Sequence, residues 1–398
     1  MSIIRKRGMS MENIIKYTFM NKNVELFDVE MNHGSAIRIE NIRENNKHLL
    51  PVFLLRKYDS GLSPTAFNSW WSGRRIPASR EGVKALLWSL KDDVMNEPQI
   101  NNLDHLAEKA MGLSLSDQYW IRPNEGVKWD DVNFFTNPFS DDIGRLLTTG
   151  DWNAGDLLSP DNTSDGVVKK RWKIINNMRC LIKGSSGAPW YAQPRREVFA
   201  SKLAKALMSP LSKKFVVPYH LATFDDEPFS VCPNFVTPRT EYVQFNQLVA
   251  GLKFDSYSDG FNHCRKYYGE NAYVMDIMFI LDYLVLNEDR HTGNFGMIRD
   301  VSTGDFVEPA PIFDTGSSLF HNSMATNEAL AIAKPFDKSH EKQIFLINIR
   351  LYRESLENAQ SDLFNIFYDS FDGSNEGEER LNGIFGIVNR RIADLLNR

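Results

Sequence analysis

The clearest pattern of apolar positions in the chain predicts one long buried helix. Its apolar residues recur at the i, i+3 and i+4 spacing of a single helical face: Val274, Ile277, Met278, Leu281, Leu284 and Val285. Beyond it, residues 295–298 alternate like a strand, residues 300–305 contain turn formers, and residues 306–313 can return as a second strand. We therefore expect a helix, a loop and a hairpin in succession.

A second patterned region upstream predicts another hairpin followed by a helix. Two strand-like runs, residues 167–175 and 178–183, are joined by Asn176-Asn177, a pair that tolerates the positive φ of a tight turn. The next predicted helix carries an apolar stripe of Ala200, Leu203, Ala204 and Leu207. Residues 229–236 have the pattern of a strand that runs into an irregular segment.

These patterns divide the chain into four parts and predict an α+β fold. Residues 1–95 mix strand-like runs with a helix, and residues 96–145 form a bridge rich in aromatic side chains, which need a surface to bury against. Residues 146–235 form a β-rich unit and residues 236–398 a helical one. Helices are expected near 341–358 and 379–397, with a short acidic linker at 372–379.

Polar residues suited to phosphoryl transfer gather on the predicted loop. Asp289 and Asn294 follow the apolar helix, and Asp314 follows the return strand. In phosphoryl transfer one carboxylate orients and accepts the proton of an attacking hydroxyl, while an Asn and a second carboxylate hold Mg²⁺ on the nucleotide phosphates. The alternative is a loop whose Asp and Asn cap turns. That alternative explains Asn294 alone but not the whole set.

A lysine and a glutamate upstream lie where a nucleotide-anchoring pair would be expected. Lys183 ends an apolar run, and burying its charge is costly unless it meets a negative partner. Glu197 shares a helical face with the apolar stripe, so we expect it to pair with Lys183. Alternatively, the lysine reaches solvent and the glutamate is favoured by the dipole of a helix N-terminus.

The order Asp289-Arg290-His291-x-x-Asn294 resembles the catalytic loop of HipA-like serine/threonine kinases, an order shared by phosphoinositide kinases. The resemblance implies a bilobal protein-kinase-like fold, with a small β-rich lobe, a helical large lobe and an extra N-terminal α/β domain. It also implies Asp289 as catalytic base, with Lys183 and Glu197 in the catalytic set. Asn294 and Asp314 would be magnesium ligands. His291 is grouped with the nucleotide-binding residues, although Arg290 and His291 can instead order the loop.

Residues 159–170 occupy the position of the phosphate-binding loop in this resemblance. Their small and turn-forming residues let backbone amides approach phosphates, and a lysine can add charge: Thr163, Ser164, Gly166 and Lys170. Loops of this family can carry an autophosphorylated serine, for which Thr163 or Ser164 would be the counterpart. Added phosphate there would repel bound ATP and eject the loop.

Residues 229–236 correspond to the hinge that binds adenine. Pro233 has no N–H to donate, so the bonding groups must come from neighbours such as Cys232 or Phe235. An ordinary buried edge strand is the alternative.

The leading functional hypothesis is transfer of the γ-phosphate of ATP, with Mg²⁺, to Ser or Thr of a protein substrate. A small-molecule or lipid-headgroup kinase is the second hypothesis, although no basic or amphipathic membrane-binding stretch supports the lipid version. A catalytically silent nucleotide-binding module is the third. A metal-dependent hydrolase using Asp289, His291 and Asp314 leaves Lys183 and Glu197 without a role. The family resemblance further suggests that the chain is the toxin of a toxin–antitoxin system, with an antitoxin as its partner.

The overall composition narrows the classes of partner and the cellular compartment to be expected. The 398 residues have a formal net charge of -5, which gives no footprint for direct nucleic-acid binding. Three cysteines without a metal-ligand pair suggest a reducing cytoplasm, and no apolar stretch has transmembrane length. The segment Trp70–Arg80 combines two tryptophans with three arginines. It could bind phosphate, nucleic acid or an acidic partner, but arginines that pair with acidic neighbours such as Glu81 are the favoured interpretation.

Overall fold

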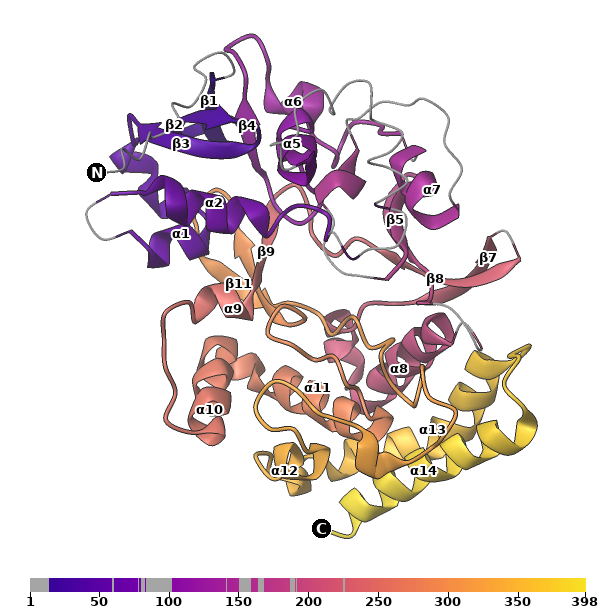
Figure 1. The fold of residues 1–398 in the computed structure, drawn as a ribbon. Helices are drawn as coiled ribbons and strands as arrows, with labels where there is room; N and C mark the ends of the chain where they lie inside the picture. Colours follow the sequence, from indigo (N-terminus) through magenta and orange to yellow (C-terminus); the bar gives the residue numbers. More distant parts are fainter. Residues whose placement is uncertain are drawn as a thin grey trace, which may run out of the picture.

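The chain is a mixed α+β protein in which three sheets lie beside a group of helices (Figure 1). The computed structural model describes residues 14–58, 61–77, 79, 83, 102–140, 142–149, 159–163, 168–186, 190, 192–224 and 226–398. Within these ranges, none of the helices combines the length and the apolar character that spanning a bilayer requires.

The first sheet belongs to the N-terminal region and has the order β3-β2-β1-β4. Its strands are β1 (Ile14–Asn21), β2 (Val24–Asn32), β3 (Ser35–Glu40) and β4 (Tyr119–Arg122). Alternation along β2 buries Phe27, Val29 and Met31 on one face. This face packs against Phe67 and Trp71 of α2 (Pro64–Ser72). The same core also receives residues from η2 (Glu44–Leu49), α1 (Val52–Arg56) and α5 (Asn102–Lys109).

The second sheet, β5-β6-β8-β7, carries the predicted lysine hairpin. Its strands are β5 (Lys170–Ile175), β6 (Met178–Lys183), β7 (His220–Phe224) and β8 (Glu227–Pro233). Asn176 and Asn177 have φ values of 49° and 63°, so the turn has the positive φ expected from its sequence. The adjoining helical elements are α6 (Trp129–Val132), α7 (Asp142–Thr149), η3 (Pro160–Thr163) and α8 (Gln193–Leu207).

The third sheet, β11-β10-β9, supports the predicted catalytic loop. It contains β9 (Thr240–Gln244), β10 (Gly296–Asp300) and β11 (Phe306–Pro309). A Cβ at Gly296 would stand 2.1 Å from the carbonyl oxygen of Val243, so only glycine allows β9 and β10 to approach so closely. The loop that ends at Asn294 is therefore held directly against β9.

The helical part of the molecule is built around α11 (Ala272–Val285), the helix that the apolar pattern predicts. All of its residues from Val274 to Val285 are buried. Around it lie η4 (Pro210–Phe215), α9 (Phe245–Leu248), α10 (Tyr257–Tyr268), η5 (Gly269–Asn271), η6 (Glu328–Leu330), α12 (His340–Ile344), η7 (Ile349–Tyr352), α13 (Arg353–Phe371) and α14 (Glu378–Leu396). In Figure 1, α8 joins this group, and it packs against α13.

A buried ionic cluster fastens the third sheet to the N-terminal region. We call Arg299, Glu241 and Tyr119 the junction cluster. Arg299 Nη1 donates to Glu241 Oε1 at 2.8 Å, and the Tyr119 hydroxyl donates to the same oxygen at 3.1 Å. Burial raises the pKa of Glu241 to about 7, although the charge of Arg299 opposes the shift. The remaining donors of Arg299 reach backbone carbonyls, including Leu50 at 2.9 Å and Gly304 at 2.7 Å.

Several boundaries differ from the sequence predictions. The return strand expected over 306–313 ends at Pro309, and the first strand of the lysine hairpin begins at Lys170. The helix expected near 341–358 is divided among α12, η7 and the start of α13. Ile344, Ile347 and Ile349 are all buried there, a spacing that no single helical face provides. Strand β4, which pairs with β1, comes from the segment interpreted as a bridge. Most of the helix expected at 83–90 lies outside the described residues. The domain limits stay a prediction.

Candidate active site

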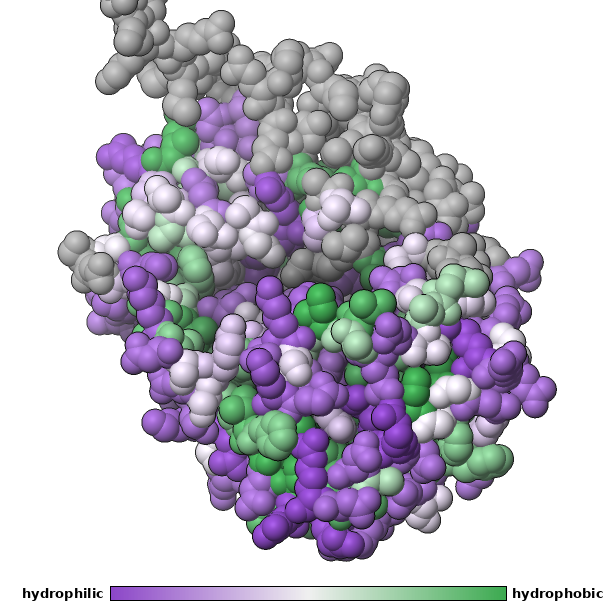
Figure 2. Space-filling model, turned by 60° about the horizontal axis from the view of Figure 1, so that its bottom comes forward, coloured by the Kyte–Doolittle hydropathy of each residue, from purple (hydrophilic) through white to green (hydrophobic). Residues whose placement is uncertain are grey.

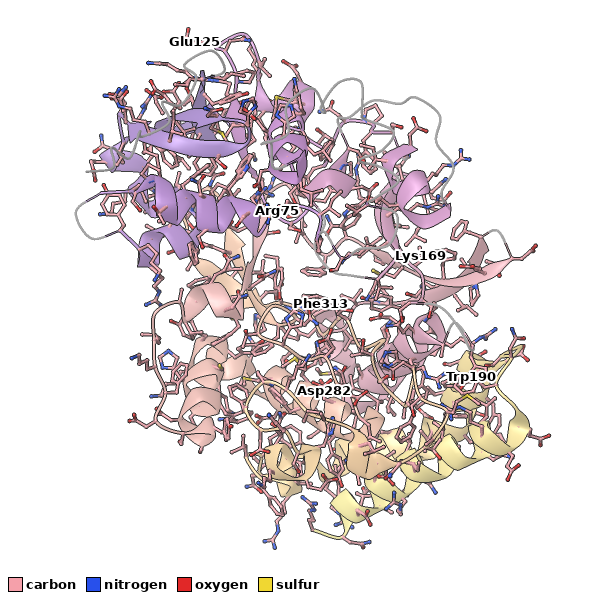
Figure 3. The ribbon with its side chains drawn as sticks, in the orientation of Figure 1. Arg75, Glu125, Lys169, Trp190, Asp282 and Phe313 are labelled. Carbon is pink, nitrogen blue, oxygen red and sulfur yellow. The ribbon has the colours of Figure 1, made fainter. Side chains whose placement is uncertain are left out.

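A cavity of about 560 Å³ lies between the second sheet, α8 and the predicted catalytic loop. Figure 3 shows Phe313 in the middle of the molecule, between the β-rich part and the helical part. Its apolar wall includes Trp172, Leu181, Val217, Phe235 and Phe313. Its polar lining includes Lys183, Glu197, Asp289, Asn294 and Asp314, which are the residues singled out from the sequence. The cavity therefore has an apolar side and a charged side.

The charged side contains one cation held between two carboxylates. We call Lys183, Glu197 and Asp314 the cleft cluster. Lys183 Nζ donates to Glu197 Oε2 at 2.7 Å and to Asp314 Oδ1 at 2.5 Å, so the predicted Lys183–Glu197 pair is present. The Glu197 side chain is 2% exposed, whereas that of Asp314 is 38% exposed and faces the cavity. Asp314 is thus the member of the cluster that a ligand can reach.

The pKa shifts of the cleft cluster follow from its mutual charges. Burial by itself would lower the pKa of Lys183, but the charges of Asp314 and Glu197 outweigh it and raise that pKa well above its ordinary value. Burial likewise opposes ionisation of Asp314, yet the charges of Lys183 and Lys170 hold its pKa far below the usual range. Both Lys183 and Asp314 are therefore charged at neutral pH.

Backbone geometry places Glu197 directly behind the turn that follows Asp314. Glu197 Oε1 accepts the N–H of Thr315 at 2.8 Å. A Cβ at Gly316 would lie 2.9 Å from Glu197 Oε2, so the glycine permits this close approach. Asp314 itself has a φ of +56°, which is uncommon for a residue with a side chain and is frequent at functional sites. The backbone of Asp314, Thr315 and Gly316 therefore packs closely against Glu197 of α8.

The loop between α11 and β10 is organised from within by Arg290. Its side chain is fully buried and donates from Nε to Asp282 Oδ2 at 2.8 Å. Arg290 Nη1 also donates to the carbonyl oxygens of Asn294, at 2.9 Å, and Phe313, at 2.6 Å. Arg290 therefore links the loop to the residue just before Asp314, and it orders the loop rather than contacting a ligand.

Asp289 and Asn294 are brought to the cavity at opposite ends of this loop. The Asp289 carboxylate is 43% exposed, while Asn294 is 6% exposed. Asn294 Nδ2 donates to the carbonyl oxygen of Asp289 at 2.8 Å, which leaves Asn294 Oδ1 as the side-chain acceptor. His291 also lines the cavity, and its Nδ1 accepts the N–H of Gly293 at 3.0 Å. His291 thus helps form the turn.

The chemistry of Asn294 and Asp314 fits a magnesium ion that arrives with phosphates. Both supply oxygen atoms, which Mg²⁺ prefers, and both line the same cavity. Within the described ranges, no group of three or more His, Cys, Asp or Glu residues is arranged to hold a metal. Magnesium sites commonly use one or two protein side chains and complete the coordination shell with substrate phosphates and water.

The overall arrangement matches a known kinase-like structure. HipA of Shewanella oneidensis MR-1, solved with HipB and operator DNA of a toxin–antitoxin system, matches over 96% of this chain and 99% of its own, with a TM-score of 0.56 and 13% sequence identity. The chain has a HipA-like kinase fold.

A shorter match is the Helicobacter pylori proinflammatory kinase CtkA, which covers 57% of this chain and 93% of its own at 18% identity. The TM-score of this match is 0.44. No protein-family model matches the sequence, and no curated protein matches significantly. The HipA-like fold therefore rests on three-dimensional similarity, and it agrees with the resemblance of the catalytic-loop motif.

Cys232 lines the main cavity, as expected for a residue of the predicted hinge, but its N–H does not face that cavity. The N–H of Asn234 donates to the carbonyl oxygen of Arg179, and ladder bonds alternate by two residues, so the N–H of Cys232 points to Leu181 of β6. Burial also raises the pKa of the Cys232 thiol to about 12. The carbonyl of Pro233 points to the other edge of β8, and both Pro233 and Phe235 line the cavity.

The structure also corrects the predicted role of Thr163. Thr163 is buried in η3, and its hydroxyl donates to the carbonyl oxygen of Leu113 at 2.6 Å. Thr163 lines a different cavity, beside Arg74 and Glu241, and it does not line the main cavity. Lys170 does line the main cavity. Ser164 and Gly166 lie outside the described residues.

Sequence reasoning missed two acidic residues that support the site. Asp282 lies in the apolar helix α11 and holds both Arg290 and Asn287, the latter at 2.8 Å. Glu376, in the stretch interpreted as a simple acidic linker, is buried and pairs with the buried Arg196 of α8. A carboxylate inside an apolar helix was a usable signal for Asp282, because a buried charge needs a partner. No comparable signal marked Glu376.

The Trp70–Arg80 segment is structural where it is described. Trp70 and Trp71 are buried in the N-terminal core, and Arg74 lies over the Trp70 ring with 4.7 Å to its centroid. Arg74 pairs with Asp117, and Arg75 pairs with Asp104 at 2.8 Å. The favoured interpretation of paired arginines is therefore confirmed for these two, although their partners are more distant in sequence than Glu81.

Proposed function

We propose that this chain is an ATP- and Mg²⁺-dependent protein kinase that transfers the γ-phosphate to Ser or Thr. The observation that carries the proposal is the convergence of four side chains on one cavity: Lys183, Asp289, Asn294 and Asp314. The HipA-like fold supports a kinase reaction at this position. Known phosphoryl-transfer sites use the same set of groups, namely a lysine, a base, and an Asn and an Asp on the metal.

The proposal includes a division into two lobes. We assign the second sheet to a small lobe, together with α8, and the helices around α11 to a large lobe. Lys183 and Glu197 then come from the small lobe, and Asp289, Asn294 and Asp314 come from the large lobe. The first sheet forms the additional N-terminal domain. The apolar side of the cavity, with Phe235 and Phe313, suits the adenine ring.

In the proposed reaction, Asp289 orients the acceptor hydroxyl and takes its proton. The hydroxyl oxygen forms a bond to the γ-phosphorus, the bond from that phosphorus to the β–γ bridging oxygen breaks, and ADP leaves. Lys183 binds phosphate oxygens, with Glu197 fixing its position. Magnesium, when held by Asn294 and Asp314, neutralises charge on the phosphates. The protein contributes positioning and charge stabilisation rather than a covalent intermediate.

Autophosphorylation and an antitoxin-type partner are further parts of the proposal. Because Thr163 is buried, Ser164 is the proposed phosphate acceptor in the loop. The similar HipA structure contains HipB, which motivates a search for a partner of that type. Mass spectrometry that maps phosphorylated residues after incubation with ATP tests the first idea. Co-purification of the chain with a DNA-binding protein encoded by an adjacent gene tests the second.

The decisive experiment follows labelled γ-phosphate into protein, lipid and small-molecule acceptors. We expect label in protein Ser or Thr with the wild-type chain. Asp289→Ala and Asp314→Ala should each abolish transfer while the circular dichroism spectrum stays unchanged. Asp305→Ala, an exposed aspartate in the nearby hairpin, serves as a control that keeps activity. Label in lipid or small molecules alone would favour the second hypothesis, and full activity of either cavity variant would refute the assigned roles.

A further inference from the structure

The carboxylate proposed as catalytic base already has a partner from elsewhere in the chain. Lys334 Nζ donates to Asp289 Oδ1 at 2.8 Å, across 45 residues of sequence. The two side chains are 48% and 43% exposed. An acceptor hydroxyl must donate its proton to this same carboxylate. Lys334 therefore occupies a position that the proposed reaction requires to be free.

Lys334 belongs to a segment fixed at both ends, residues 325–339, which we call the strap. At its start, Arg380 donates to the carbonyl oxygens of Ser323 and Met324, each at 2.9 Å. At its end, the His340 ring nitrogen Nε2 lies 2.9 Å from the carbonyl oxygen of Asn287. The strap thus runs between two anchors that fasten it beside the catalytic loop.

Between these anchors, two polar contacts join the strap to the catalytic loop. The N–H of Ile332 donates to Glu288 Oε1 at 3.2 Å, and Lys334 contacts Asp289. Leu330 and Ile332 remain 67% and 52% exposed. On the face that Figure 2 shows, apolar residues form separate green patches within a largely polar surface.

Phe336 of the strap is buried against Phe261 and Phe279, and Ala333 is buried as well, so the strap backbone is held in place. The half-exposed side chain of Lys334 is the part that can move away from Asp289.

We propose that the strap is an autoinhibitory latch in which Lys334 masks Asp289 from the acceptor hydroxyl until the Lys334 side chain moves away. The inference rests on the proposed kinase function for its consequence, whereas the masking itself is a property of the resting chain. Movement of the Lys334 side chain breaks the Lys334–Asp289 ion pair and exposes the carboxylate. An acceptor protein therefore competes with Lys334 for the same oxygen atoms.

The strength of this latch follows from its exposure. Exposed ion pairs shift an equilibrium by roughly two- to fivefold, and dissolved salt weakens them. The latch thus tunes access to Asp289 and does not abolish it. Lys338 provides a matched control, because it is an exposed lysine four residues further along that lies in the same strap.

Carboxyl footprinting tests the masking without any kinase activity. The full-length protein is labelled with a carbodiimide and glycine ethyl ester, and mass spectrometry measures the labelling rate at Asp289. Lys334→Met should raise this rate about two- to fivefold, while Lys338→Met should match wild type and Lys334→Arg should stay near it. Added salt should raise the rate in wild type but not in Lys334→Met. Equal rates in wild type and Lys334→Met would overturn the latch.

Acceptor kinetics then test its consequence. Lys334→Met should raise kcat/KM for the protein acceptor about two- to fivefold, and Lys338→Met should leave it unchanged. A fall in kcat for Lys334→Met would instead make Lys334 a group that assists transfer, and would overturn autoinhibition. If no chain transfers phosphate, the proposed function fails, and footprinting still decides whether Lys334 masks Asp289.

Discussion

The cleft cluster and the junction cluster are two buried ionic groups that differ in how completely they are satisfied. In the junction cluster, the donors of Arg299 reach Glu241, Tyr119 and the carbonyls of His48, Leu50 and Gly304. In the cleft cluster, the hydrogen bonds that Lys183 makes within the described part of the chain go to two carboxylates, and Asp314 opens onto a cavity of about 560 Å³. The junction cluster borders a second cavity, but Glu241 and Tyr119 are only 3% and 2% exposed there, whereas the Asp314 side chain is 38% exposed in the main cavity.

This difference separates a structural ionic group from one available for chemistry. A fully hydrogen-bonded buried cation fixes the position of the elements around it, because losing any partner leaves an uncompensated charge. A cation held by two carboxylates beside a cavity can exchange one of them for a phosphate oxygen. Charge and burial alone would not distinguish Arg299 from Lys183. The two cations differ in their hydrogen-bond partners, because those of Arg299 are fixed protein groups, whereas one partner of Lys183 is open to the cavity.

The largest expected effect is on stability, at Arg299. Even when Glu241 takes up a proton, Arg299→Met leaves the carbonyl oxygens of His48, Leu50 and Gly304 without their donor, so we expect a loss of about 3–5 kcal/mol in unfolding free energy. Denaturant unfolding measures it. Arg299→Lys, which keeps the charge but not the planar fork, should lose less. A loss below about 1 kcal/mol would mean that the junction cluster does not fasten the N-terminal region.

The next effect is on activity, at Lys183. Lys183→Met should slow phosphate transfer roughly 10²–10³-fold, because a charged donor to the phosphates is lost. The variant should stay folded, since Glu197 can take up a proton when its cation is removed. A steady-state transfer assay and a melting curve together measure both quantities. Lys213→Met, at an exposed lysine, is the control. Normal phosphate transfer together with reduced stability would mean that Lys183 has a structural role and not a chemical one.

A smaller effect is the pH dependence of the junction cluster. The pKa of Glu241 is about 7 in the folded chain against an ordinary value of 4.5, so the folded state binds this proton more tightly than the unfolded state. Stability should therefore fall as pH rises from about 4.5 to about 7, by roughly 1–3 kcal/mol. Unfolding free energies measured across this range should show this slope in wild type and lose it in Glu241→Gln. Identical slopes would show that Glu241 does not titrate there.

The burial of His321 adds a pH dependence of opposite sign. Burial lowers the pKa of His321 to about 4, so its contribution to stability weakens as pH falls below the ordinary value of 6.5. The comparison between wild type and Glu241→Gln removes this contribution, because both chains contain His321.

The smallest expected effect is at Thr163. Thr163→Val removes the donor to the Leu113 carbonyl and should cost about 1–2 kcal/mol of stability. Phosphate transfer should stay at the wild-type rate, because Thr163 does not line the main cavity. Denaturant unfolding and the transfer assay measure the two quantities. A large loss of activity with unchanged stability would restore Thr163 to the phosphate-binding loop.

The parts predictable from sequence were those that local rules determine. The period of apolar residues gave helix α11, and Asn176-Asn177 indicated the turn between β5 and β6. The Lys183–Glu197 pair was predictable because both charges lie beside apolar residues and must find partners when buried. Asp289, Asn294 and Asp314 could be grouped because the first two share one loop and the third follows the hairpin that comes directly after it.

The parts that could not be predicted depend on contacts between distant segments. Thr163 is buried against Leu113, which lies 50 residues away, and Lys334 reaches Asp289 from a strap with no regular period. The pairing of Arg196 with Glu376 spans 180 residues. The direction of the Cys232 N–H follows from the register between β6 and β8, which local patterns do not specify.

The most direct test of the central claim is a crystal structure of the chain with a non-hydrolysable ATP analogue and Mg²⁺. We predict the triphosphate in the main cavity, with Lys183 on phosphate oxygens and a magnesium ion bound by Asn294 Oδ1 and the Asp314 carboxylate. A nucleotide bound elsewhere, or a metal that contacts neither Asn294 nor Asp314, would contradict the account.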